Sequence, residues 1–313
     1  MNTLMKRSVA YYKTPLWRRM LKNWELYLFL IPAIVYFCVF CYMPMYGVQI
    51  AFRNFMPNRS ILGSPWVGLK HFHRIFRLPN FGQIVWNTLA ISLYSLAVSF
   101  PVPILLALVI NEIRAETFRR TVQTVSYAPH FISTVVLVSL IDVFFNTDYG
   151  MANKIIQFFG GNAIPFLIDQ RYFRSLYVFS GVWQSSGWSA IVYLSALSGI
   201  DPQLHESAMI DGASRFKRII HINIPCILPT VSLLFILQTG SLMSVGFEKV
   251  FLMQKNVNLD VSEVLSTYVY KQGLLQAQYS FSAAVGLFNS VVNCILLIIT
   301  NSISNSLGGN SLF

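Results

Sequence analysis

The sequence predicts an all-α integral membrane protein with six transmembrane helices. Of its 313 residues, 55% are hydrophobic and 11% charged, and the mean hydropathy is +0.55, whereas soluble domains contain about 25% charged residues. Apolar stretches recur that reach the roughly 20 residues needed to cross a ~30 Å hydrocarbon core. The segments between them are mostly short. One compact membrane domain is therefore expected.

Hydropathy defines each span in turn. The six predicted spans are residues 26–46, 84–110, 122–145, 176–200, 227–246 and 281–303. Together they give a transmembrane domain of residues 26–306, between a basic N-terminal segment, 1–25, and a short C-terminal tail, 307–313. Since the number of spans is even, both ends of the chain should lie on the same side of the membrane.

The basic N-terminal segment sets the predicted orientation. Its cations are Lys6, Arg7, Lys13, Arg18, Arg19 and Lys22. They precede a long apolar stretch without a small-residue cleavage site, which is typical of an uncleaved signal anchor. Over the whole chain, with this cluster included, Lys and Arg divide almost equally between the two sides. The density of the cluster beside the first span therefore places both termini in the cytoplasm of a multi-pass plasma membrane protein. The net charge of +11 is attributed to basic residues that face anionic lipid, and no nucleic-acid partner is expected.

A short amphipathic helix is predicted between the first two spans, lying in the outer interface. Its apolar side chains share one helical face: Leu69, Phe72, Ile75 and Phe76. The pair His71 and His73 has no neighbouring Cys, Asp or Glu, so no metal site is expected. The four cysteines lie in or beside apolar stretches and are assigned to packing.

The sequence lacks the motifs of an enzyme. No Gly-Lys dipeptide occurs, which excludes the usual phosphate-binding loop, and no paired carboxylates lie inside a span. We therefore expect a transport subunit that binds no cofactor itself. An ATP-independent carrier stays open as an alternative, because ionisable groups near the membrane midplane are costly and mark coupling sites, and His130 and Asp142 in the third span come closest to it. Each lies near one end of that span, where it can also reach water.

The loop 201–225 contains strong local signals. Asp201 suits an N-cap and Pro202 a first helical position, while Gly212 can adopt the left-handed conformation that ends a helix. A second helix should start near Ser214 and stop before Pro225. The result is a protruding elbow of two short helices joined at a glycine.

The elbow has apolar positions with no lipid to cover them: Leu204, Ala208 and Ile210. They require a protein partner. The second half of the loop is alternatively an interfacial helix, with Arg215, Lys217 and Arg218 directed outward from the headgroups.

The loop also resembles a known motif. Glu206-Ser207-Ala208, three residues, Gly212, nine residues and then Ile222-Asn223-Ile224-Pro225 is similar to the Glu-Ala-Ala loop of binding-protein-dependent ABC importers. The spacing matches throughout, and only Ser207 and Ile224 depart from the pattern. The resemblance implies that the loop is a coupling helix that docks on a separate ATPase subunit in the cytoplasm. It assigns this role to Glu206, Ser207, Ala208, Gly212, Ile222 and Pro225.

Similarity to carbohydrate permeases of the MalF-like type covers roughly residues 66–301. Segments 183–188, 246–253 and 267–270 resemble the LplB/YteP-type branch in particular. The resemblance implies the type I (MetI-like, MalF-like) permease architecture and import of oligosaccharides from complex polysaccharides, including acidic ones. It also implies four partners: a second, different permease, two ATPase subunits that bind ATP and Mg, and an extracellular solute-binding lipoprotein. The same architecture could import a non-sugar solute.

A sugar path requires aromatic faces and amide or hydroxyl groups on cavity-lining helices. The candidates in the last three spans are Trp183, Gln184, Trp188, Gln238, Asn289 and Asn293. Polar and small residues also mediate helix packing in membranes, which is the alternative role for each. Glu248 and Lys249, after the fifth span, are alternatively part of the docking surface for the binding protein.

Overall fold

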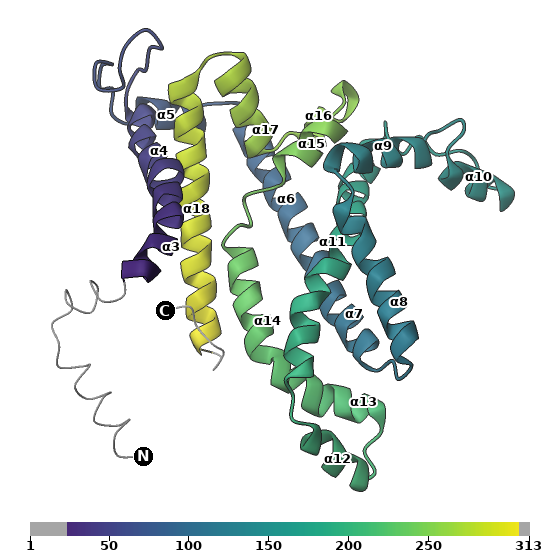
Figure 1. The fold of residues 1–313 in the computed structure, drawn as a ribbon. Helices are drawn as coiled ribbons and strands as arrows, with labels where there is room; N and C mark the ends of the chain where they lie inside the picture. Colours follow the sequence, from purple (N-terminus) through teal and green to yellow (C-terminus); the bar gives the residue numbers. More distant parts are fainter. Residues whose placement is uncertain (1–23, 307–313) are drawn as a thin grey trace, which may run out of the picture. The chain divides into compact units, whose positions relative to one another are not determined.

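A computed structural model of the chain describes residues 24–306 (Figure 1). Most of the predicted N-terminal segment 1–25 and the whole predicted tail 307–313 lie outside the described residues. The chain divides into two units, one ending at Gly68 and the other beginning at Leu69. Within the described residues the structure is helical, and its only β-structure is an isolated bridge between Arg53 and Trp66.

The first unit is one long apolar helix followed by a closed loop. The helix consists of α3 (Trp24–Tyr36), the π-helix η1 (Phe37–Tyr42), α4 (Met43–Met45) and the 3-10 helix η2 (Tyr46–Phe52). It contains the predicted first span. Its large apolar side chains are mostly exposed within the unit, as a lipid-facing helix requires. The loop closes where Phe52 stacks on Trp66 at 5.6 Å between ring centroids.

The second unit contains the remaining helices. In chain order they are α5 (Lys70–Phe76), α6 (Phe81–Ser99), α7 (Pro101–Asn111), α8 (Glu116–Tyr127), η3 (Ala128–Phe131), α9 (Thr134–Phe144), α10 (Met151–Phe158), α11 (Gln170–Ser198), α12 (Pro202–Ile210), α13 (Arg215–Arg218), η4 (Ile219–Asn223), α14 (Ile224–Thr239), α15 (Phe247–Met253), η5 (Asn256–Asn258), α16 (Leu259–Ser262), α17 (Leu265–Tyr270), η6 (Lys271–Leu275) and α18 (Tyr279–Ser306).

The helix α11 is the centre of this unit. Its C-terminal half packs with α7 and α14 in a core that includes Tyr193, Leu197 and Ile227. Its N-terminal half joins a second core with α6, α9 and α15, which includes Phe173 and Val250. Figure 1 shows the two ends of the unit, with α12 and α13 beyond the first core and α15–α17 beside the second.

The predicted amphipathic helix 69–76 is present as α5, but its apolar face is divided. Ile75 and His71 are buried, and α5 packs against α18. Leu69 and Phe76 stay exposed. The Arg74 guanidinium lies 4.6 Å from the centre of the Phe281 ring, so a cation–π contact supports the packing on α18.

The predicted third span, 122–145, is not one straight helix. Residues 116–131 and 134–144 form two helices that meet at an angle of 99°. Pro129 lies in the 3-10 turn η3 that ends the first helix, and the Ser133 hydroxyl accepts a hydrogen bond from the Val136 amide at 3.4 Å to cap the second. A hydropathy window averages over both helices at such a break, so the bend could not be predicted from hydropathy.

The helix before the fifth span continues through Pro225, contrary to the prediction that it stops there. Residues 215–239 form one continuous helix. A π-helical turn, η4, precedes the proline, and the Ile224 amide donates to the Ile219 carbonyl five residues earlier. Proline lacks an amide hydrogen and its ring crowds the carbonyl four residues back, so a wider turn accommodates it. The first unit repeats this arrangement, with η1 before Pro44.

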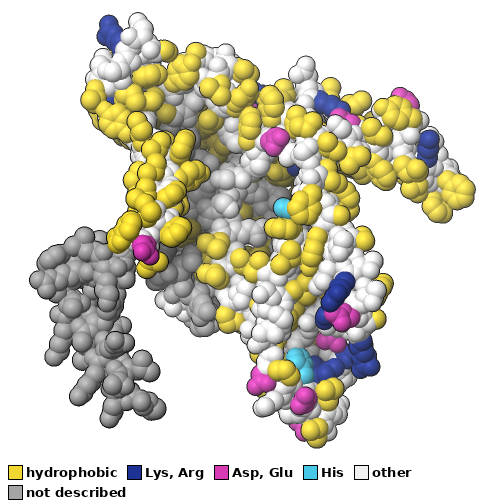
Figure 2. Space-filling view, in the orientation of Figure 1, with side chains coloured by type: hydrophobic (Ala, Val, Ile, Leu, Met, Phe, Trp, Pro, Cys, Tyr) yellow, Lys and Arg dark blue, Asp and Glu magenta, His cyan; other side chains and the backbone are white. Residues whose placement is uncertain are grey.

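Four helices are long and apolar enough to cross a membrane: residues 24–52, 81–111, 215–239 and 279–305. The bent pair of α8 and α9 would make a fifth. The remaining predicted span, 176–200, lies within α11 except for its last two residues, and the 29 residues of this helix extend about 44 Å. Figure 2 shows apolar side chains over much of the visible surface, with charged side chains gathered toward the ends.

Gly187 controls how closely α8 and α11 approach. A Cβ atom at Gly187 would lie 2.0 Å from the Ser126 carbonyl oxygen. Gly187→Ala should therefore lower the free energy of unfolding by about 1–3 kcal/mol, because the two helices must separate. The matched control is Gly286→Ala in α18, where a Cβ meets nothing within 4 Å; it should be neutral or stabilising by up to ~1 kcal/mol. Denaturant titration of the purified protein measures both, and equal stabilities would contradict the close approach.

Candidate functional site

The elbow between α11 and α14 forms as its local sequence predicts. The Asp201 carboxylate caps α12 by accepting from the Gln203 amide at 2.9 Å. Gly212 has φ +74°, its amide donates to the Met209 carbonyl at 3.1 Å, and the Ala213 amide donates to the Ala208 carbonyl at 2.8 Å. These two bonds define a Schellman motif, whose left-handed position favours glycine.

The surface of the elbow is apolar and uncovered. Leu204 is 47% exposed and Ile210 is 86% exposed. Glu206 is also exposed and forms no ion pair with any residue of the described part of the chain. Exposed apolar side chains at a helical projection indicate a surface that another protein covers.

The rest of the predicted coupling motif lies at the start of the continuous helix 215–239. Ile222 is half-buried and Pro225 is exposed, while Asn223 between them is fully buried. Ser207 lies on α12, and its hydroxyl donates to the Leu204 carbonyl at 3.2 Å. The motif residues therefore divide between a projecting helix and the root of a long helix.

Gln184 and Trp188, predicted to line the path, hold the break between α8 and α9. The Gln184 amide Nε2 donates to the Ile132 carbonyl at 2.8 Å, at the corner where regular helix is interrupted. The Trp188 ring stacks on His130 with centroids 4.6 Å apart and planes 4° from parallel. It also meets Phe131 edge to face at 5.8 Å. The structure gives both side chains a packing role.

Trp183 lies elsewhere, on a large apolar cavity. The cavity has a volume of about 900 Å³ and is lined by α9, α10, α11 and the segments between them. Aromatic side chains dominate it, including Phe144, Tyr149 and Phe179. Trp183 is 52% exposed there, so its ring face is available to a ligand, to lipid or to a partner chain.

A smaller cavity of about 170 Å³ contains Gln238 and is rich in hydroxyl groups. Its polar lining comes from α6, α11, α14 and the segment after α14: Ser92, Ser95, Tyr177, Gln238, Ser241 and Ser244. The buried Ser92 hydroxyl has no hydrogen-bond partner among the described residues. Such a lining suits a ligand with several hydroxyl groups.

Asn293 and Asn289 on α18 differ in their bonding. Asn293 accepts from the Met243 amide at 2.8 Å and donates to the Ser244 hydroxyl at 3.0 Å, which ties α18 to the wall of the 170 Å³ cavity. The Asn289 Oδ1 atom is buried without a partner in the part of the chain that the structure describes. The structure thus brings Gln238 to this cavity and Asn293 to a residue of its wall, and leaves Trp183, Gln184 and Trp188 outside it.

Sequence reasoning missed Tyr177, Ser92, Ser95 and Ser244 in this cavity. The serines form pairs three residues apart, 92 with 95 and 241 with 244, but small residues at helical spacing usually mark helix packing. Nothing in the sequence distinguishes a hydroxyl that faces a cavity from one that bonds its own helix. Only the arrangement of three separate segments does so.

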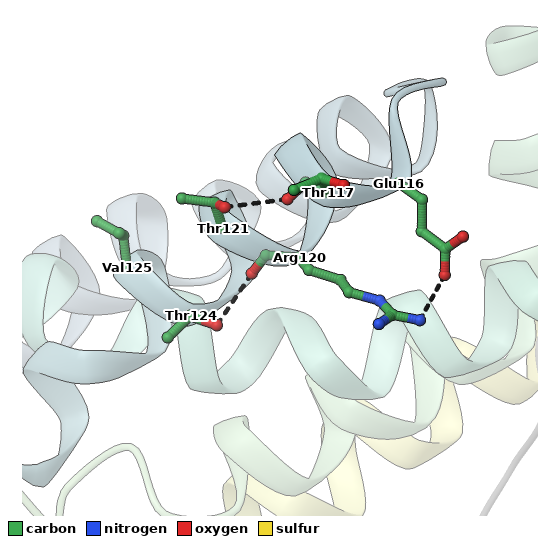
Figure 3. Close-up of a pocket in the computed structure, with 6 residues that line it drawn as sticks. All are labelled: Glu116, Thr117, Arg120, Thr121, Thr124 and Val125. Carbon is green, nitrogen blue, oxygen red and sulfur yellow. Dashed lines mark hydrogen bonds and ion pairs between the residues drawn. The ribbon is translucent and has the colours of Figure 1, made fainter.

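A third hollow follows the polar face of α8 (Figure 3). All six lining residues belong to that helix, where Arg120 pairs with Glu116 at 2.5 Å and the Thr121 and Thr124 hydroxyls donate to carbonyls one turn earlier. Its polar groups are therefore largely satisfied within one helix. The hollow is an open face and forms no enclosed site.

The bond from Gln184 predicts a stability difference between two glutamines in apolar helices. Gln184→Leu should lower the free energy of unfolding by about 1–3 kcal/mol, because the Ile132 carbonyl loses its side-chain partner. Gln238→Leu is the matched control, since no side-chain hydrogen bond to Gln238 is present among residues 24–306; its stability should not change. Thermal unfolding of the purified variants compares them, and an unchanged Gln184→Leu protein would refute the bond's role.

Known proteins share this architecture. The chain is 44% identical over 94% of its length to the polygalacturonan/rhamnogalacturonan transport system permease protein YteP of Bacillus subtilis (strain 168), and covers 92% of that protein. It is 42% identical to protein LplB of the same organism, with 92% and 91% of the two chains covered. A crystal structure of a bacterial ABC transporter involved in the import of the acidic polysaccharide alginate matches with a TM-score of 0.85 and 38% identity, over 93% of this chain and 98% of that one.

These similarities confirm the predicted LplB/YteP-type resemblance and the predicted all-helical permease architecture. The model of the family described as binding-protein-dependent transport system inner membrane component matches residues 99–307. This chain belongs to that family.

Proposed function

We propose that this chain is one of two different permease subunits of a bacterial ABC importer for oligosaccharides, including acidic ones. Two of the three similar proteins named above carry polygalacturonan/rhamnogalacturonan or alginate in their descriptions, and polygalacturonan and alginate are polymers of uronic acids. The chain would span the plasma membrane with both termini in the cytoplasm. An extracellular solute-binding lipoprotein would deliver the sugar.

The observation that carries the proposal is the uncovered elbow of residues 201–225. Its exposed Leu204, Glu206 and Ile210 would dock in a cleft of an ATPase subunit, and two such subunits would bind ATP and Mg²⁺. ATP binding would then move the elbow and open the cavity between the paired permeases to the outside. This chain would supply coupling and a path, with no catalytic group of its own.

The sugar would pass the 170 Å³ cavity. Gln238 and the serine hydroxyls would bind sugar hydroxyls, while Asn293 positions Ser244 for the same purpose. Asn289 and Trp183 stay candidates for other parts of the path. We assign Gln184 and Trp188 to positioning the corner between α8 and α9.

The alternative of an ATP-independent carrier loses its two ionisable candidates. The Asp142 carboxylate pairs with the Lys255 ammonium at 3.2 Å, and His130 stacks on Trp188. Each group therefore has a structural partner that accounts for its presence.

Reconstitution tests the proposal directly. Vesicles with both permeases, the ATPase subunits and the binding protein should accumulate labelled galacturonate oligosaccharides only when ATP and Mg²⁺ are supplied. Vesicles with this chain alone should show no accumulation. Uphill transport by this chain without the ATPase, or failure of the complete complex to carry any oligosaccharide, would contradict the proposal.

The elbow gives a second prediction. Gly212→Val should abolish uptake and sugar-stimulated ATPase activity while membrane insertion stays normal, because a β-branched residue is strained at φ +74°. Gly160→Val is the matched control: Gly160 has φ +85°, and it ends α10 with the same pair of hydrogen bonds far along the chain from the elbow. Its transport should persist. Normal uptake by Gly212→Val would remove the elbow from the mechanism.

A further inference from the structure

Lys249 on α15 is a largely buried cation without an acidic partner. Its ammonium nitrogen donates to the Tyr177 carbonyl at 2.7 Å and lies 4.7 Å from the centre of the Tyr177 ring. It occupies the notch left by Gly181, where a Cβ atom would lie 3.2 Å from it. Burial lowers the pKa of Lys249 to about 8, so the side chain is still mainly charged at neutral pH.

Two other lysines in this half of the unit have an acidic partner, whereas Lys249 has none among the residues described. Lys255 pairs with Asp142, and Lys271 lies 2.9 Å from the Glu263 carboxylate. Lys249 takes part in no ion pair within residues 24–306, although Glu248 is next to it in the sequence. An ammonium can donate three hydrogen bonds, and one is used. A buried cation without a counter-ion is costly unless another charge arrives.

Lys249 contacts Tyr177, a residue that lines the hydroxyl-rich cavity of about 170 Å³. Tyr177, which holds the ammonium, is part of the cavity lining, and so is Gly246, three residues before Lys249. The Tyr177 hydroxyl is 3.3 Å from the position of a Cβ on Gly246, so the tyrosine ring that the ammonium contacts also reaches the cavity lining. The lysine stem has four flexible carbons, so a change of rotamer is the movement that would bring the ammonium to the cavity.

The cavity chemistry fits part of an acidic sugar. Its volume holds several water molecules, enough for a carboxylate and its adjacent hydroxyls. The Ser92 side chain is part of the lining, and its buried hydroxyl has no hydrogen-bond partner among the described residues. Hydroxyls on one side and an unpaired ammonium beyond Tyr177 together match a uronic acid ring, which bears hydroxyls and one carboxylate.

We propose that Lys249 is the counter-ion for a sugar carboxylate in the translocation path and makes this permease selective for uronate-containing oligosaccharides. This rests on the proposed function, since it assumes that sugar passes the cavity. The other source of a carboxylate is an acidic side chain of a partner subunit. The buried position against α11 and beside a hydroxyl-lined cavity favours the sugar.

The test compares uptake of galacturonate oligosaccharides with that of their methyl esters, which have the same shape without the charge. The complete complex is reconstituted with native chain, Lys249→Gln, Lys249→Arg or Lys154→Gln. Lys154 is an exposed lysine on α10 and controls for the loss of one positive charge. The affinity of the binding protein for each sugar is measured separately, so that its own preference can be distinguished from that of the permease. The same binding protein is used in every sample.

Lys249→Gln should raise the KM for the acidic sugar about tenfold and leave uptake of the ester unchanged, while Lys249→Arg and Lys154→Gln behave like the native chain. Equal kinetics of Lys249→Gln and native complex for the acidic sugar would overturn the proposal. So would an equal loss for acid and ester, or failure of the complex to assemble, which would indicate a partner-subunit carboxylate. If the native complex carries neither sugar, the proposed function itself fails.

Discussion

Backbone groups at interrupted helices have no water to bond inside a bilayer, and this constraint organises the second unit. Irregular backbone is tolerated at membrane depth only where protein satisfies it. Side-chain amides do so here at separate breaks. Gln184 bonds the Ile132 carbonyl at the α8–α9 corner, Asn87 donates to the Asp260 and Glu263 carbonyls at 2.8 and 3.1 Å, and Asn293 accepts from the Met243 amide.

The same constraint separates two kinds of polar residue in apolar helices. Some bond an interrupted backbone and so belong to the framework, as Gln184 does. Others, such as Gln238, face a cavity and bond no backbone of the described chain. The distinction matters for function, because a ligand competes only for the second kind. Asn293 combines both, since its other end holds the Ser244 hydroxyl at the cavity wall.

The elbow could be predicted because its signals are local. Asp201, Gly212 and Ser214 act through bonds to residues two or three positions away, so a short segment contains all the information. The path could not be predicted in the same way. The Gln184 bond joins residues 52 positions apart, and the cavity joins α6, α11 and the end of α14. Residue type alone gave the candidates but not their contacts.

The predicted helix boundaries were wrong at two places, and each place contains a proline. Hydropathy predicted one span over 122–145 because the strongly apolar α9 raises the average of a window that also includes the end of the amphipathic α8, although Pro129 and Ser133 end one helix and start the next. At Pro225 the local rule predicted a stop, but the π-helical turn η4 relieves the clash and the helix continues. A proline therefore lies at an irregular helical turn in both places. The surrounding backbone determines whether the helix ends there, as at Pro129, or continues through a wider π-helical turn, as at Pro225.

The helix boundaries around the elbow determine how a movement of the elbow is transmitted to the rest of the chain in the proposed transport mechanism. Only Gly199 and Ile200 separate α11 from the N-cap of α12, and the helix 215–239 leaves the elbow without a break. The two helices flanking the elbow are thus the ones that bring Tyr177 and Gln238 to the cavity. A displacement of α12 would be transmitted to the cavity by α11 and by the helix 215–239. The close approach at Gly187 keeps α8 against α11, so the α8–α9 corner would move with it.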